Sequence, residues 1–307
     1  MKRISVIIPV YYNEESLARL FTELRTVEHQ LGERGCELEL IFVDDGSGDK
    51  SFAELMTIKK QRDNTRIVKL ARNFGAMEAS KIGLNFVQGD AFMWLAADLQ
   101  DPPDLIPALV DRWLAGSKFV IYARAGRNDP FMTRLSAKLY YVLLRFFVVR
   151  DYPEGGYDLA LMDKVMLPYL RDSAKNVNTT LLAFWLGFEP DIMHYQRQER
   201  EHGRSRWSFR KKIKFFVDTF LGFSMVPLRL MTVIGLVVSL LSFTYGSIIV
   251  GYAIFGVRDV AGFPTLVALT TFLLGLIIIM LGIIGEYIWR IYDQLNGRPE
   301  VVIDEIY

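Results

Sequence analysis

Acidic and amide side chains follow an apolar segment near the middle of the chain. The apolar residues 91–97 run directly into Asp98 and, two positions later, Gln100, and two prolines come shortly afterwards. This pattern predicts a buried strand of a parallel sheet, followed by a helix that begins near Asp104. Oxygen ligands at the carboxyl end of a strand are typical of Mg²⁺ or Mn²⁺ sites, where one or two carboxylates act together with substrate phosphates. The sequence therefore favours a cation site on Asp98 and Gln100, the alternative being an ordinary solvated turn.

Two acids end another apolar segment in the same manner. Residues 38–43 form a second apolar run, and Asp44 and Asp45 follow it, ahead of a glycine-rich turn. Acids at the end of such a strand commonly hold ribose hydroxyls or the N–H groups of a base. The alternative is that they cap the helix expected to begin at Ser51. A third apolar segment ends at residues 9–11, so the sequence predicts three polar strand ends on one sheet edge.

The elements that must position these residues alternate between strand-like and helix-like patterns. The predicted strands are 4–9, 38–43, 66–70, 91–97 and 118–122, and the predicted helices are 15–31, 76–87 and 105–115. Such alternation is typical of an α/β fold with a mostly parallel, doubly wound sheet. The glycine-rich dinucleotide fingerprint is absent from the sequence, which argues against an ordinary NAD-binding fold.

Bulk composition restricts the classes of partner. The chain has 307 residues, of which 51% are hydrophobic and 23% charged, and its formal net charge is +1. A nearly neutral chain without a basic tail gives no reason to expect a nucleic-acid partner. The single cysteine, Cys36, excludes an internal disulfide and suits a reducing compartment. His29, His194 and His202 lie far apart in the sequence, which argues against a zinc site.

Two long apolar segments follow the alternating part of the chain. Residues 230–255 and 263–288 each exceed the roughly 20 residues that a helix needs to cross a bilayer. They predict a transmembrane hairpin, the alternative being a pair of buried core helices. No signal peptide precedes Ile4, so we expect no export of the N-terminal domain by that route. Basic residues flank both outer ends of the hairpin and predict that these ends are cytoplasmic: Lys211, Lys212, Lys214, Arg229, Arg290 and Arg298.

Two further helices are predicted to contact the membrane surface. Residues 132–149 are apolar but carry Arg134, Lys138 and Arg145, which suits either an interfacial helix or a buried helix of a soluble domain. Residues 207–229 combine basic and aromatic side chains directly before the first span. We therefore expect an amphipathic helix there, lying in the headgroup layer.

These patterns divide the chain into four parts. We expect a cytoplasmic domain at 1–206, a juxtamembrane helix at 207–229, two transmembrane helices at 230–289 and a cytoplasmic tail at 290–307. Small residues in the spans permit close helix packing and thus favour a homo-oligomer: Gly235, Ser239, Gly275 and Gly282.

Five motifs, in this order, resemble the polyprenyl-phosphate glycosyltransferases of glycosyltransferase family 2: Ile7–Val10, Val43–Ser47, Arg72–Gly75, Ala97–Pro102 and Arg200–Trp207. Dolichyl-phosphate mannose synthase and the bacterial undecaprenyl-phosphate glucosyltransferases belong to that family. The resemblance covers essentially the whole chain. It implies a Rossmann-like GT-A fold and a bacterial inner-membrane enzyme. The implied reaction is inverting transfer of one sugar from a nucleotide-diphosphate sugar, with UDP-glucose favoured, to polyprenyl phosphate at the cytoplasmic face, for glycan or cell-envelope modification.

The resemblance also implies roles for individual positions. It places the nucleotide sugar against Pro9, Tyr11, Glu14, Asp44, Asp45, Ala97, Asp98 and Arg124. It places Mg²⁺ or Mn²⁺ on Asp98 and Gln100, and it makes Asp98 and Asp158 the catalytic residues. It places the acceptor phosphate against Arg124, Arg200, Ser205 and Arg206, although Arg200 and Arg206 also suit binding of lipid headgroups.

Two positions depart from the family pattern. Ala96 stands where the family usually has an acid, which removes one carboxylate near the donor and favours the alternative of a non-catalytic sugar-nucleotide-binding scaffold. Tyr11 and Tyr12 make the first motif one tyrosine longer than usual, so the role assigned to Glu14 can shift by one position. A processive polysaccharide synthase is a third hypothesis. The Gln-x-x-Arg-Trp signature of those enzymes is missing, and two spans are few for a polymer channel.

The chemistry of the acceptor decides what Asp158 has to do. A phosphate monoester has a second pKa of about 6, so much of it is dianionic at cytoplasmic pH. Its oxygen is already a nucleophile, and a strong general base is not required. We therefore expect Asp158 to orient the attack or tune charge, while a cation neutralises the leaving diphosphate and arginines hold the acceptor phosphate.

Overall fold

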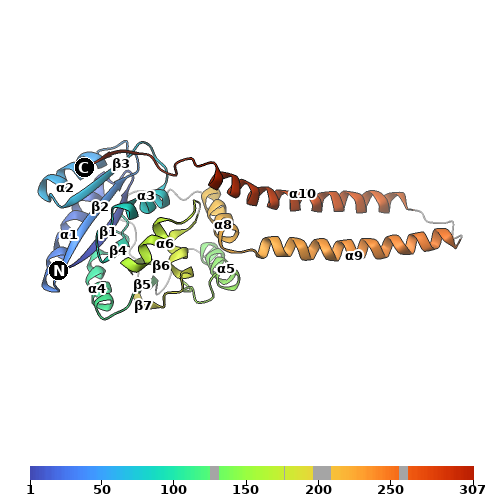
Figure 1. Cartoon of the computed structure of the whole chain (residues 1–307), viewed down its shortest axis with the longest axis horizontal. Coiled ribbons are helices and arrows are strands. Elements are labelled where there is room, and N and C mark those ends of the chain that lie inside the picture. Colours follow the sequence, from blue (N-terminus) through green and yellow to red (C-terminus); the bar gives the residue numbers. More distant parts are fainter. Residues whose placement is uncertain (125–130, 176, 196–208, 256–261) are drawn as a thin grey trace. The chain divides into compact units, whose positions relative to one another are not determined.

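The structure, a computed structural model, describes residues 1–124, 131–175, 177–195, 209–255 and 262–307 (Figure 1). The chain divides into two compact units. The first unit contains residues 1–216 together with 299–307, and the second contains residues 217–298.

The first unit is built on one mixed sheet. Among the described residues its strand order is β7-β5-β6-β4-β1-β2-β3-β8. The strands are β1 (Lys2–Val10), β2 (Cys36–Asp44), β3 (Thr65–Leu70), β4 (Ala91–Trp94), β5 (Phe119–Arg124), β6 (Tyr157–Asp163), β7 (Pro190–Tyr195) and β8 (Ile303–Ile306). Parallel pairing joins β4, β1, β2 and β3, and it joins β5 to β7. The predicted α/β fold is confirmed, but β6 and β8 run antiparallel to their neighbours, which the sequence analysis did not predict.

Helices connect most of these strands. They are α1 (Glu14–Glu33), α2 (Ser51–Gln61), α3 (Ala76–Gly83), α4 (Ile106–Leu114), α5 (Phe131–Phe147), α6 (Leu167–Arg171) and α7 (Thr179–Trp185). The strand predicted at 91–97 ends at Trp94, because the chain then turns toward the residues of the site. The helix predicted at 76–87 ends at Gly83 and continues as a single 3₁₀ turn over Leu84–Phe86.

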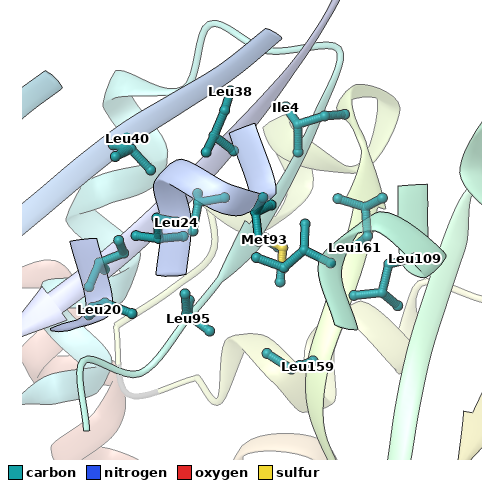
Figure 2. Packing of buried hydrophobic residues seen from close by; sticks show 14 of the residues in the cluster. Ile4, Leu20, Leu24, Leu38, Leu40, Met93, Leu95, Leu109, Leu159 and Leu161 are labelled. Atoms are coloured by element: carbon teal, nitrogen blue, oxygen red, sulfur yellow. The ribbon is translucent and has the colours of Figure 1, made fainter. Parts of the chain in front are cut away.

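Strands β1 to β6 are largely buried on both faces, which explains why those predicted from the sequence read as apolar runs. In β1, Ile4 and Ile8 belong to the hydrophobic cluster that includes Leu20 and Leu24 of α1 (Figure 2). Ile7 belongs to a second cluster. Because successive side chains of a strand point to opposite faces, the two clusters lie on the two sides of the sheet. Packing on both faces of the sheet holds the strands in place, and with them the polar residues at the strand ends.

A segment beyond the predicted hairpin returns to the sheet of the first unit. The sequence analysis assigned residues 290–307 to a cytoplasmic tail; within it, β8 pairs antiparallel with β3. The Lys69 ammonium lies 2.8 Å from Asp304 Oδ2. The Lys81 ammonium, at the end of α3, lies 2.8 Å from Glu300 Oε2. The edge of the sheet at β3 is therefore closed by residues that follow α10 in the sequence.

The second unit contains the end of α8 (Phe209–Phe223), from Val217 onward, and all of α9 (Val226–Ile254) and α10 (Phe263–Leu295). Two stretches, Val226–Ile249 and Leu269–Leu295, are long and apolar enough to cross a membrane. Only 6% and 0% of their most apolar windows are buried inside the protein, which argues against the alternative of buried core helices. Within this unit, the Arg290 guanidinium lies 2.6 Å from Asp218 Oδ1. Tyr287 donates a hydrogen bond of 3.2 Å to the carbonyl oxygen of Ser224.

Candidate active site

Two strained residues mark the carboxyl edge of the sheet. In the described part of the chain, Tyr12 and Leu99 are the non-glycine residues with positive φ, at 57° and 58°. Tyr12 lies just beyond β1, and Leu99 lies beyond β4, the strand that pairs with β1. Left-handed backbone is unfavourable for a bulky side chain and persists where the surroundings impose it, often at functional sites. The edge predicted from the three polar strand ends is thus also where the backbone is strained.

Tyr12 is accommodated by the loop after β2. Its backbone N–H donates a hydrogen bond of 3.2 Å to Ser47 Oγ. A Cβ atom on Gly48 would lie 2.7 Å from the Tyr12 hydroxyl oxygen, so only glycine fits there without a shift. The rings of Tyr11 and Tyr12 meet edge to face, with centroids 4.7 Å apart. The additional tyrosine of the first motif therefore fits because Tyr12 adopts a positive φ and because residue 48 is a glycine.

Glu14 forms hydrogen bonds with the loop that precedes α2. Its carboxylate accepts a hydrogen bond of 2.8 Å from the backbone N–H of Lys50, and its own N–H lies 3.4 Å from Asp49 Oδ2. Beside this pair, the N–H of Asn13 donates to Ser51 Oγ at 2.8 Å. These bonds join the start of α1 to the start of α2. Glu14 therefore holds two loops together in this structure, and the nucleotide contact that the sequence analysis assigned to it stays a prediction.

Asp44 and Asp45 are both buried, yet their carboxylates have different surroundings. Asp45 accepts hydrogen bonds from the side-chain amide of Asn73 at 2.9 Å and from the backbone N–H groups of Phe74 and Gly75 at 2.7 and 3.0 Å. Burial raises the pKa of the Asp45 carboxyl above its ordinary value, although the N–H donors oppose the rise. Asp45 therefore holds the loop that leads into α3, a role that the sequence analysis did not assign to it.

The Asp44 carboxylate accepts fewer hydrogen bonds than that of Asp45. Its Oδ1 accepts a hydrogen bond of 3.3 Å from the backbone N–H of Ser47, and burial raises the pKa of its carboxyl. Gly46, between them, has a φ of 67°, and a Cβ atom there would lie 2.6 Å from the backbone carbon of Arg72. This close approach brings the loop after β2 against the loop after β3. Of the two carboxylates, that of Asp44 therefore accepts fewer hydrogen bonds from the neighbouring loops.

The turn that carries Asp98 exposes alternate side chains. Ala96, Asp98 and Gln100 are half-buried, whereas Ala97 and Leu99 are buried. The N–H of Gln100 lies 3.3 Å from Asp98 Oδ1. The carbonyl oxygen of Ala97 accepts a bond of 2.7 Å from the hydroxyl of Ser16, which fixes the turn to α1. Asp98 and Gln100 therefore share one accessible side of the turn.

The donor set at this turn suits a cation that substrate helps to hold. Among the described residues, no cluster of three or more His, Cys, Asp or Glu side chains is arranged to bind a metal. Mg²⁺ sites commonly use one or two carboxylates and take their remaining ligands from phosphate and water. One carboxylate from Asp98 and an amide oxygen from Gln100 fit such a site, with Ala96 adding no ligand of its own.

Four side chains from separate elements meet beside this turn. Arg124, at the end of β5, donates from Nε and from Nη2 to the two carboxylate oxygens of Asp158 on β6, each at 2.5 Å. The hydroxyl of Tyr195, at the end of β7, lies 2.8 Å from Asp158 Oδ2 and 2.6 Å from Asp101 Oδ1. Asp101 belongs to the same turn as Asp98. A continuous polar path therefore links the turn after β4 to an arginine and an acid on neighbouring strands.

This path is largely shielded from water. The side chains of Arg124 and Asp158 are 17% and 10% exposed. Burial lowers the pKa of the Arg124 guanidinium, but the hydrogen bonds that it donates to the Asp158 carboxylate outweigh that effect, so its pKa lies above the ordinary value. Burial and the two carboxylates raise the pKa of Tyr195 well above its usual range. Arg124 thus stays cationic and Tyr195 stays a neutral hydrogen-bond donor at any physiological pH.

The structure brings together most of the predicted residues at one sheet edge. Those from β1, β2, the turn after β4, β5 and β6 all belong to strand ends there: Pro9, Tyr11, Asp44, Asp45, Ala97, Asp98, Gln100, Arg124 and Asp158. Arg200, Ser205 and Arg206 lie outside the described residues. The sequence analysis did not assign roles to Asp101, Tyr195 and Asn73. Asp101 stood next to a predicted ligand, but no pattern in the sequence pointed to Tyr195, because the strand that carries it was not predicted.

Comparisons with known proteins agree with this fold. Residues 5–177 match the family model described as "Glycosyl transferase family 2". An uncharacterized glycosyltransferase of Synechocystis is 32% identical over 99% of this chain and 95% of its own length. A prophage-derived bactoprenol glucosyl transferase of Shigella flexneri is 31% identical over 98% of this chain and 97% of its own length.

A solved structure shares the fold. It is glucosyl-3-phosphoglycerate synthase from Mycobacterium tuberculosis, in complex with Mn²⁺, UDP-glucose and phosphoglyceric acid. The TM-score is 0.51 at 17% identity, and the match covers 72% of this chain and 79% of that one. This likeness supports a GT-A-like sheet with the helices described above. The family match over more than half of the chain, together with relatives of matching length, shows that the chain belongs to glycosyltransferase family 2.

Proposed function

We propose that this enzyme transfers a single sugar from a nucleotide-diphosphate sugar to a polyprenyl phosphate, with inversion. The observation that carries the proposal is the polar path at the sheet edge, which joins the Asp98 turn to the Arg124–Asp158 pair in a chain with two membrane-span candidates. The relatives named bactoprenol glucosyl transferase support a polyprenyl acceptor, since they match nearly the full chain.

The donor would lie across the ends of β1, β2 and β4. Tyr11 is half-buried beside Tyr12, and Asp44 is buried but accepts fewer hydrogen bonds than Asp45. These two residues are therefore suited to contact the nucleoside of the donor. Pro9 and Ala97 line the same strand ends. We favour UDP-glucose as the donor, which the fold neighbour crystallised with UDP-glucose makes a reasonable first substrate to test.

Asp98 and Gln100 would hold Mg²⁺ or Mn²⁺ together with the diphosphate of the donor. When bound, the cation neutralises the charge that develops on the leaving diphosphate. Arg124 adds a permanent positive charge nearby, and its planar guanidinium suits phosphate oxygens. Arg124 can therefore contact the phosphates with the donor nitrogens that Asp158 leaves available.

The acceptor phosphate needs positioning more than activation. A dianionic phosphate oxygen attacks the anomeric carbon directly, and the bond to the leaving diphosphate breaks on the opposite face, which inverts the configuration. Both oxygens of Asp158 already accept hydrogen bonds from Arg124, and one lies next to the Tyr195 hydroxyl. This favours Asp158 as the group that orients Arg124. Arg200, Ser205 and Arg206 are proposed to hold the acceptor phosphate in line with the donor.

The membrane elements would bring the lipid acceptor to the site. The strand β8 follows α10 and pairs with β3, which precedes α9. If α9 and α10 each cross the membrane once, both ends of the hairpin must therefore lie on the side of the catalytic sheet. The basic residues that flank the spans favour the cytoplasmic side. A bacterial inner membrane and a homo-oligomer remain parts of the proposal.

One face of α5 supports contact with the bilayer surface. Leu139, Val142 and Phe146 recur at helical spacing and are 58%, 44% and 79% exposed. Lys138 is exposed next to this apolar face. An exposed apolar stripe with a neighbouring cation suits a helix in the headgroup layer, as proposed for residues 132–149 and 207–229.

The experiment is sugar transfer from a panel of labelled UDP- and GDP-sugars to polyprenyl phosphate in detergent, with Mn²⁺, with Mg²⁺ or with a chelator. We expect one lipid-linked monosaccharide, formed best from UDP-glucose and lost with the chelator. A ladder of longer products would identify a processive synthase instead. Nucleotide binding without transfer from any donor would favour the non-catalytic scaffold, the reading that Ala96 supports.

A further inference from the structure

The hydroxyl of Tyr195 occupies a junction that the proposed chemistry does not explain. It lies 2.6 Å from Asp101 Oδ1 and 2.8 Å from Asp158 Oδ2, and its single proton is donated to one of these two oxygens at a time. Tyr195 and Asp101 are 7% and 5% exposed. A hydroxyl buried between two carboxylates is costly to place unless it is well bonded, so its position is narrowly determined.

The two acids that it bridges belong to different parts of the site. Asp101 ends the turn that begins with Asp98 and Gln100. Asp158 holds Arg124 through two hydrogen bonds. Tyr195 comes from a third place, the end of β7, which pairs with the strand that carries Arg124. The hydroxyl therefore fixes the distance between the proposed cation turn and the proposed phosphate-binding arginine.

The ring of Tyr195 has a separate, purely structural role. It packs against Tyr122 with centroids 5.7 Å apart and planes at 64°. A phenylalanine would keep this contact and remove only the hydroxyl. The two roles can thus be separated by a single substitution.

We propose that Tyr195 is a positioning residue that couples the cation turn to the Arg124–Asp158 pair through its bridging hydroxyl. This role rests on the proposed transfer reaction. Without the hydroxyl, the turn and the ion pair lose their common anchor and can shift relative to each other. Misplacing reacting groups by about 1 Å can cost about 100-fold in rate, while binding of either substrate changes much less.

The test compares Tyr195→Phe with Tyr157→Phe in the full-length protein in detergent. Tyr157 is a matched control: it lies on the neighbouring β6, and its hydroxyl donates to the carbonyl oxygen of Thr180 at 2.5 Å, away from the carboxylates of the site. We expect Tyr195→Phe to lower kcat by about 10- to 100-fold with the donor KM within about 3-fold. We also expect it to raise the Mn²⁺ concentration for half-maximal rate. Tyr157→Phe should leave both kcat and the Mn²⁺ dependence near the wild-type values.

A second variant tests the bridge independently of the folding of the first. Asp101→Ala removes the acceptor at the other end of the bridge, whereas an asparagine would still accept from the hydroxyl through its amide oxygen. Because both substitutions break one bridge, the double variant should lose little more rate than either single variant. Multiplied losses, or an unchanged kcat and Mn²⁺ dependence in Tyr195→Phe, would overturn the role of Tyr195. A wild-type protein that transfers no sugar would instead refute the proposed function, and this role with it.

Discussion

At the scale of single residues, the carboxylates of the candidate site differ in how many hydrogen bonds they accept. Asp45 and Asp158 spend their oxygens on neighbouring N–H donors, so they hold other parts of the site in place. Asp98 lies on the accessible side of its turn, two positions from an alanine where the family usually has an acid. The proposed cation site thus relies on one carboxylate, that of Asp98.

That dependence can be measured at positions 96 and 98. Asp98→Asn should lower transfer by about 100-fold or more, because the carboxylate that neutralises the cation is lost. Ala96→Asp should lower the Mn²⁺ concentration for half-maximal rate several-fold, since residue 96 lies on the same accessible side of the turn. Activity as a function of free Mn²⁺ is the measurement. An Asp98→Asn protein with the wild-type Mn²⁺ dependence would remove this residue from the cation site.

Asp158→Asn separates positioning from base catalysis. The amide keeps the shape of the side chain but removes the charge that holds Arg124, so we expect kcat to fall by about 10- to 100-fold and residual transfer to persist. Steady-state rates and nucleotide binding by calorimetry are the measurements. Asp191→Asn is the control, because Asp191 accepts a bond from Ser117 at the opposite end of β7. Complete loss of transfer with intact nucleotide binding would make Asp158 the general base.

At the scale of elements, β8 completes a sheet edge with residues from beyond the hairpin. Two lysines fasten it and the residues just before it. Lys81 pairs with Glu300, and Lys69 pairs with Asp304 and, at 3.7 Å, with Glu305. The two lysines differ in burial. The side chains of Lys81 and Glu300 are 11% and 28% exposed, whereas those of Lys69 and Asp304 are 32% and 47% exposed. The Lys81 ammonium also donates to the carbonyl oxygens of Ser173 and Ala174, so it ties the tail to two other segments.

This difference predicts unequal effects on stability. Glu300→Gln should destabilise the first unit by about 1 kcal/mol, because it leaves a mostly buried ammonium without its carboxylate partner. Asp304→Asn, the same chemical change in the same segment, should have a smaller effect, because Lys69 is more exposed than Lys81 and keeps Glu305 at 3.7 Å. Thermal unfolding of the two variants in one detergent compares them. Equal shifts would show that the Lys81 pair does not fasten the tail.

The elements that the sequence predicted share a feature that the missed ones lack. Segments such as 38–43 and 66–70 are buried on both faces, so their apolar runs identify them as strands without knowledge of their neighbours. In β7 and β8 polar and apolar residues are mixed, and these strands form because a partner edge is present. Tyr195 could not be found for this reason. Asp98, Gln100 and Asp158 could be proposed from the sequence because strand ends and motifs point to them locally.

At the scale of the whole molecule, the hairpin and the tail together restrict the topology. The pairing of β8 with β3 requires an even number of crossings between them. The basic flanks then select the side. This combination predicts a cytoplasmic catalytic unit and places the connection between α9 and α10 on the far side of the membrane.

Single cysteines can test this topology, because the native Cys36 is buried and can be replaced by Cys36→Ala. In that background, Asp259→Cys should react with a membrane-impermeant maleimide in intact cells. Arg298→Cys should react only after the membrane is opened. Labelling of both positions from outside would contradict the proposed orientation, and labelling of neither before opening would show that the connection does not cross.

The late position of β8 also orders the biosynthesis of the protein. The ribosome completes β3 more than 200 residues before β8, as the span between Lys69 and Asp304 of 235 positions shows. Throughout that interval the edge of β3 offers unpaired N–H and C=O groups, which are a ready template for aggregation. The edge can be covered only after both apolar helices have been synthesised, because β8 follows them in the chain. Until then the open edge is a feature by which chaperones can distinguish a nascent chain from a finished enzyme.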